Sequence, residues 1–111
     1  MTRANRIKVL QAALNAVNLA IPILQQAVNR GDAQPSELIR LRNRRDDLAA
    51  LIADMPADGA LTELNPADVT ELGTLETTLD DSIKQNALIN ATVEGAKDVI
   101  DAANRVHEIL S

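Results

Sequence analysis

Hydrophobic residues recur at alternating intervals of three and four along most of this chain. That spacing places apolar side chains on one face of an α-helix. The first such stripe is unbroken and consists of Ile7, Leu10, Leu14, Val17, Ile21, Leu24 and Val28. Pro22 falls on the outward side of the stripe, which keeps its phase on either side of the proline. We therefore expect one bent helix over about residues 3–29 rather than two separate helices.

A turn and a second helix follow. Gly31 suits the left-handed position that ends many helices, and Pro35 suits the first position of the next helix. The second stripe consists of Leu38, Leu41, Leu48, Leu51, Ile52 and Met55. It predicts a helix over about residues 35–54. Because the connection is short, this helix should lie antiparallel to the first one.

The longest pattern begins after a loop over residues 55–65. Asn65 is a suitable N-cap for a helix that starts at Pro66, and apolar residues then recur as far as Leu110. We expect one helix over about residues 66–110, roughly 65 Å long if it is unbroken. Ser82 and Asn86 place polar residues in the apolar stripe. The alternative is a break or bend near Asn86 to Asn90, or at Gly95.

These elements predict a single all-α domain over residues 1–111. Its expected architecture is an antiparallel helical hairpin packed on one long C-terminal helix, a three-helix, coiled-coil-like bundle. The hairpin is too short to cover the whole long helix, so we expect part of the last stripe to remain open for a partner. The expected partner-binding residues are Val93, Ala96, Val99, Ile100, Ala103, Val106 and Leu110. In the alternative, the chain folds back at Gly95 and buries this stripe itself.

The amino-acid composition excludes several classes of functional site. The 111 residues include no Phe, Tyr, Trp or Cys. Aromatic base-stacking platforms, thiolate metal sites and cysteine nucleophiles are therefore excluded. There is neither a secretory signal pattern nor a long enough apolar run to predict a membrane span. We expect a soluble, cytoplasmic protein.

The net charge of −5 is unevenly distributed. Residues 1–45 carry eight Lys or Arg and two carboxylates, whereas residues 46–111 carry three Lys or Arg and fourteen carboxylates. We favour a basic hairpin that packs along an acidic helix. A nucleic-acid-binding arm or head-to-tail self-association would also use such asymmetry. The lack of aromatics and the carboxylates Asp46 and Asp47 beside the arginine cluster disfavour nucleic acid.

No constellation of catalytic residues stands out. His107 is the single histidine, so no histidine pair can hold a metal. Glu94, Asp98 and Asp101 share one helical face, but Lys97 and Arg105 are near enough to neutralise them. No glycine-rich phosphate loop is present. We therefore expect no enzymatic activity, no cofactor and no metal.

Two stretches, "NRGDAQPSELIRLRNRRDDLAALI" and "QNALINATVEGAKDVI", resemble the flagellar type III export chaperone family. In that family an asparagine-rich stretch followed by Leu-Ile opens the C-terminal helix that holds the cargo, and the matching positions here are Asn86, Leu88 and Ile89. The chain departs from the family at Ala87, where glycine is usual, and at Pro22.

The resemblance and the open stripe together predict a non-enzymatic helical protein-binding module, with an export chaperone as its most concrete form. The alternative is a self-assembling coiled-coil component of a virion or secretion apparatus. The partner is a protein in either case: a partner helix in the first, and further copies of this chain in a homo-oligomer in the second.

Overall fold

The computed structural model describes residues 1–84 and 93–111 of the chain. These residues form the α-helices α1 (Arg3–Asn29), α2 (Pro35–Ala53), α3 (Pro66–Lys84) and α4 (Val93–Leu110), and a 3-10 turn, η1 (Asp58–Ala60). The described ranges contain no strand, and the helices pack against one another. The all-α bundle predicted from the hydrophobic periodicity is therefore confirmed.

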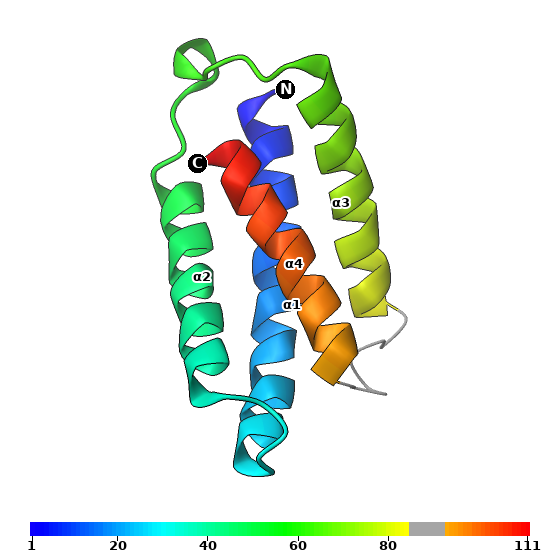
Figure 1. Ribbon diagram of the computed structural model, residues 1–111. Helices are drawn as coiled ribbons and strands as arrows, with labels where there is room; N and C mark the ends of the chain where they lie inside the picture. The colour runs from blue at the N-terminus through cyan, green and yellow to red at the C-terminus, as the bar shows by residue number, and fades with distance from the viewer. Residues whose placement is uncertain (85–92) are drawn as a thin grey trace.

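The bundle is built around α1, against which each of the other three helices packs. In Figure 1, α1 and α3 run downward while α2 and α4 run upward, and α4 lies in front of α1 between α2 and α3. α4 also packs against α3 but touches α2 much less. Both chain ends lie at the upper end of the bundle, where the connection between α2 and α3 crosses over.

Local sequence signals explain where the helices begin and end. The Thr2 hydroxyl accepts a hydrogen bond from the Asn5 amide and caps α1, and the Asn65 side chain accepts one from the Asp68 amide at the start of α3. Gly31 follows α1 with φ of 79°, and the next amide donates to the carbonyl of Ala27. α1 continues through Pro22 as a single helix.

The predicted long C-terminal helix is wrong, because α3 and α4 are two helices packed side by side and running in opposite directions. The apolar pattern continues in both, so its spacing alone could not reveal the reversal. Folding back lets α4 bury its stripe on α1 within the same chain, where a single straight helix would have left that stripe in water. Any break near Asn86 would lie outside the described residues.

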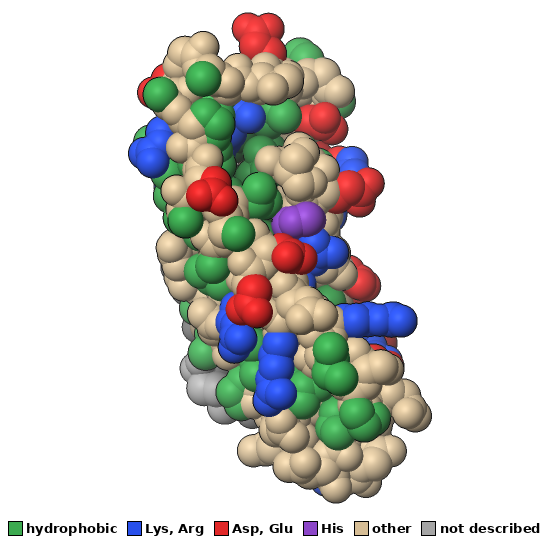
Figure 2. Space-filling model, turned by 90° about the vertical axis from the view of Figure 1, so that its left-hand side faces the viewer, with side chains coloured by type: hydrophobic (Ala, Val, Ile, Leu, Met, Phe, Trp, Pro, Cys, Tyr) green, Lys and Arg blue, Asp and Glu red, His purple; other side chains and the backbone are tan. Residues whose placement is uncertain are grey.

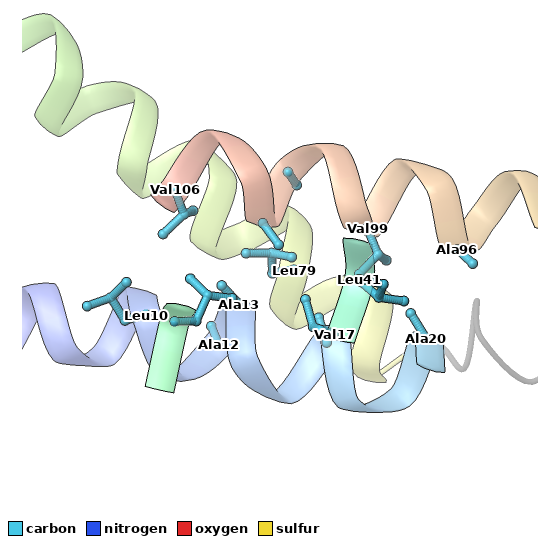
Figure 3. Packing of buried hydrophobic residues seen from close by; sticks show 14 of the residues in the cluster. Leu10, Ala12, Ala13, Val17, Ala20, Leu41, Leu79, Ala96, Val99 and Val106 are labelled. Atoms are coloured by element: carbon cyan, nitrogen blue, oxygen red, sulfur yellow. The ribbon is translucent and has the colours of Figure 1, made fainter. Parts of the chain in front are cut away.

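The core lies where α1 meets α4, α2 and α3. Its fully buried large residues are Val9, Leu10, Val17, Leu24, Leu41, Leu48, Leu72, Leu79 and Val106. Alanines of α1 and α4 lie among them, and in Figure 3 Ala20 and Ala96 are at the same end of the interface while Leu10 and Val106 are at the other. Small side chains let the two helix backbones approach closely.

The upper end of the bundle is held by a buried arginine. Arg6 is only 6% exposed, and its guanidinium donates to the carbonyl oxygens of Thr62 and Met1. The Arg3 side chain donates to the carbonyl of Met55. These bonds fasten the start of α1 to the connection between α2 and α3, and they satisfy the donors of a charge removed from water.

Candidate functional site

A groove lies between α2 and α4, with α1 beneath it. It has a volume of about 390 Å³ and is lined by Leu24, Glu37, Arg40, Leu41, Asn43, Arg44, Asp47, Lys97, Ile100 and Asn104. The groove exists because α2 and α4 both pack on α1 but make few contacts with each other. Figure 2, which faces the α2 side, shows acidic and basic side chains close together with hydrophobic side chains between them.

The deeper part of the groove is apolar. Leu24 from α1 and Leu41 from α2 belong to the buried core, while Ile100 from α4 is half-buried and packs against that core. Each wall helix thus contributes one aliphatic side chain, and α1 contributes the third. Leu24 and Leu41 are already covered by the chain itself, so Ile100 is the aliphatic lining residue that an apolar group entering the groove could contact.

One end of the groove is closed by a polar contact between its walls. Arg44 of α2 donates through Nε to Oδ1 of Asn104, 2.8 Å away, and through Nη1 to Nδ1 of His107, 2.5 Å away. Asp47 lies 3.6 Å from the same guanidinium. Because arginine only donates, His107 must present an unprotonated Nδ1 in this contact. We call Arg44, Asn104 and His107 the clasp.

The electrostatics of the clasp favour a neutral histidine. Burial lowers the pKa of His107 below its ordinary value of 6.5, and the positive charge of Arg44 lowers it further, while Asp47 acts in the opposite direction. A neutral imidazole keeps its acceptor nitrogen for Arg44. Protonation would replace that hydrogen bond with two adjacent positive charges.

Two other cations of the groove have no partner among the described residues. Arg40 on α2 and Lys97 on α4 are exposed, and neither forms a hydrogen bond or ion pair with the described part of the chain. Arg42 and Arg45 differ, because Arg42 donates to Gln25 and Arg45 pairs with Asp46. Each wall of the groove therefore carries one positive charge that is not paired within residues 1–84 and 93–111.

The residues predicted to bind a partner do not form an exposed stripe, so the expectation that part of the last stripe remains open is wrong. Ala96, Val99, Ala103 and Val106 are at most 3% exposed, because they form the face of α4 that packs in the core. Leu110 and Ile100 are half-buried and also pack against the core. The side chain of Val93 lies outside the described residues. Ile100 is the predicted residue that lines the groove.

Sequence reasoning missed the groove face of α4. Lys97, Ile100, Asn104 and His107 follow one another at intervals of three, four and three, next to the core stripe. Arg40, Arg44 and Asp47 show the same spacing on α2. The spacing identifies two polar helix faces, but no sequence signal states that these faces lie opposite each other.

A second hollow lies between α1 and α3. It has a volume of about 410 Å³, and its lining includes Lys8, Glu76 and Asp80. Lys8 Nζ lies 3.7 Å from a Glu76 carboxylate oxygen across this hollow. Its charged groups are thus already partly paired, and among its lining residues only Ile7 is a large aliphatic side chain. We regard the α2–α4 groove as the better candidate.

The described part of the chain holds no group of three or more His, Cys, Asp or Glu residues that could bind a metal ion. By length and composition alone, α1 could cross a membrane, so the expectation that no segment reaches that length needs correction. Core helices of soluble proteins pass the same test, and α1 is packed by three helices here.

No protein-family model, curated protein or solved structure matches the chain. The resemblance to flagellar export chaperones therefore stays a prediction. The positions that carry its cargo-binding motif, Asn86, Leu88 and Ile89, lie outside the described residues.

Proposed function

We propose that this protein is a non-enzymatic helical protein-binding module and that the groove between α2 and α4 is its docking surface. One observation carries the proposal: a groove lies between two helices, with the half-buried Ile100 on its floor and, on each wall, a cation that has no partner among the described residues. A partner helix in such a groove would place apolar side chains on the floor and polar ones at the rim.

The export chaperone is the most concrete form of this proposal, and the sequence resemblance supports it. The groove between α2 and α4, which run in the same direction, adds a surface on which a cargo helix would fit. This form predicts that the protein acts as a monomer or dimer and binds a segment of another protein.

The alternative remains a self-assembling structural component. Leu19 on α1 and Ile39 on α2 are large hydrophobic residues that are 45% and 57% exposed, and self-association would cover such side chains. Light scattering coupled to size-exclusion chromatography measures the mass of the purified chain. A high symmetric oligomer supports self-assembly and would contradict the binding module.

A peptide-display selection on the purified chain tests the docking surface. Ile100→Asp places a charge on the groove floor, whereas Ile39→Asp makes the same change at an exposed position of α2 that does not line the groove. We expect selected peptides to bind the wild type and Ile39→Asp but not a folded Ile100→Asp variant. Peptides that bind all three proteins equally, or a selection without enrichment, would contradict the docking surface.

Circular dichroism should accompany this test, because Ile100 also packs against the core. If Ile100→Asp unfolds, Ile100→Ser provides a milder polar replacement for the same comparison.

A further inference from the structure

We infer that the segment bound in this groove is an amphipathic helix of a partner protein with acidic residues beside its apolar face, an inference that rests on the proposed docking surface. The length of the groove and the positions of its charged lining residues each restrict the chemistry of the occupant.

The length of the groove suits a short helix. Its lining extends from Glu37 to Asp47 on α2 and from Lys97 to Asn104 on α4. At 1.5 Å per residue these spans are about 15 Å and about 10 Å. Two to three turns of a helix cover that distance and place apolar side chains at i, i+3 or i+4, and i+7 along the floor.

The unpaired cations select for negative charge. Arg44 already contacts Asn104, His107 and Asp47, so Arg40 and Lys97 are the lining cations without a partner in the described chain. They belong to opposite walls, because Arg40 is on α2 and Lys97 is on α4. A helix between these walls can direct one carboxylate to each cation while its apolar face lies against the half-buried Ile100.

The carboxylates of the groove restrict where that negative charge can lie. Glu37 stands three residues before Arg40, and Asp47 stands three residues after Arg44. Negative charge on the bound segment is therefore favoured where it faces Arg40 or Lys97 and disfavoured beside Glu37 and Asp47. The same two carboxylates and the apolar floor disfavour a nucleic-acid backbone, which would bring negative charge along the whole groove.

Three capped synthetic peptides test the inference. Each is an amphipathic helix of about 12 residues with leucine along one face and two residues beside that face that are both Glu, both Gln or both Lys. Fluorescence anisotropy measures their binding to the wild type. Since exposed charge pairs are weak individually, we expect the Glu peptide to bind about tenfold more tightly than the Lys peptide, with the Gln peptide between them.

Reversing the charges of the groove should reverse this order. In the Arg40→Glu/Lys97→Glu double variant the Lys peptide should bind more tightly than the Glu peptide. Arg42→Glu is the matched control, because Arg42 is on the same helix but does not line the groove, and it should leave the order unchanged. Single-stranded DNA and inorganic phosphate serve as competitors.

The possible results separate the two proposals. Groove-dependent binding with no preference for Glu, or competition by DNA stronger than that of the Glu peptide, overturns the acidic-helix inference but leaves the docking surface standing. If none of the peptides binds, the display selection decides: groove-dependent sequences without acidic residues overturn the inference alone. An absence of any groove-dependent sequence overturns both proposals.

Discussion

The two sides of α4 differ sharply in how they meet their neighbours. Toward α1, α4 presents Ala96, Val99, Ala103 and Val106, and these residues are almost completely buried. In the view of Figure 3, Val99 lies above Leu41 and Val17, and Val106 lies above Leu10. Toward α2, the same helix presents Lys97, Asn104 and His107, and the two helices are separated by a groove.

Side-chain size and polarity explain the difference. Alanine and valine can leave water and interlock at short distance, so the α1–α4 interface gains free energy from close packing. Long polar side chains keep their hydrogen bonds only if the helices stay apart, and the clasp joins α2 to α4 through such side chains. One helix therefore contributes a core on one side and a candidate docking surface on the other.

The largest effect is expected from a charge placed in the interface with α1. Ala103 has no exposed surface, and Ala103→Asp would bury a carboxylate without a partner. We expect a loss of several kcal/mol in the free energy of unfolding, measured by urea denaturation. The adjacent change Asn104→Asp faces the groove, where Arg44 can bind the new carboxylate, and it should change stability by less than about 1 kcal/mol.

Equal effects of these two substitutions on stability would contradict the difference between the two sides of α4. If Ala103→Asp were tolerated by the monomer, α4 would not be part of the core. The original expectation of an open stripe would then describe the protein better than the folded-back α4 does.

Much of the fold could be predicted because its signals are local. The Gly31 turn and the Asn65 cap were recognisable from residue type and position, and the structure has the expected hydrogen bonds at both. The first two helices have bounds within one residue of those predicted. These features depend on interactions between residues close together in the chain, which a sequence pattern contains.

The reversal between α3 and α4 and the groove could not be predicted in the same way. A stripe at intervals of three and four suits a helix that binds a partner and equally a helix that packs on α1 of its own chain. The clasp joins residues 60 or more positions apart, such as Arg44 and Asn104. Helical spacing places each residue on a face but does not state which two faces meet.

The next largest effect should come from Pro22→Ala in α1. Pro22 is exposed, so the change touches neither the α4 interface nor the groove lining. It restores a donor toward the carbonyl of Asn18 and removes a steric conflict there, which together are worth up to about 3 kcal/mol. The greater freedom of the unfolded chain offsets about 0.4–1 kcal/mol of this gain. We expect higher stability in urea or thermal denaturation.

Unchanged or lower stability would have a clear structural meaning. It would show that the packing of α2 and α4 on α1 requires the bend that proline favours. The difference between the two sides of α4 would then depend on the shape of α1 as well as on the size and polarity of the side chains.

A smaller effect concerns pH and the clasp. The pKa of His107 is lowered in the folded protein, so below about pH 6.5 the unfolded chain binds a proton that the folded chain does not. The stabilising contribution is complete above that pH and declines as the pH falls toward the lower folded-state value. Unfolding measured between about pH 7 and pH 5 should show this decline.

His107→Asn provides the control for this titration. Asparagine offers an oxygen acceptor to Arg44 but does not titrate, so the decline between about pH 7 and pH 5 should become shallower. Arg105 lowers the pKa of Glu71 through a hydrogen bond, and the loss of that contribution belongs to the range below about pH 4.5. An identical pH profile in the variant would mean that His107 does not stabilise the α2–α4 contact.

The smallest expected effect is that of salt. Salt screens the charged side chains at the surface of the bundle and has little effect on the apolar interface between α1 and α4. The uneven charge of the chain suggested a basic hairpin held along an acidic helix by many ion pairs. Among the described residues, however, Lys8 and Glu76 form the one ion pair between α1 or α2 and α3 or α4, at 3.7 Å, while Arg105 pairs with Glu71 and Glu108 within the acidic half.

Exposed pairs are worth about 0–1 kcal/mol and are screened over about 10 Å at 0.1 M salt. We therefore expect moderate salt to lower the free energy of unfolding by less than about 1 kcal/mol in wild type. Lys8→Gln should reduce this dependence, and Arg30→Gln, which removes a pair within the α1–α2 turn, serves as its control. Stability that rises with salt would show that repulsion within the acidic half exceeds the attraction between the halves.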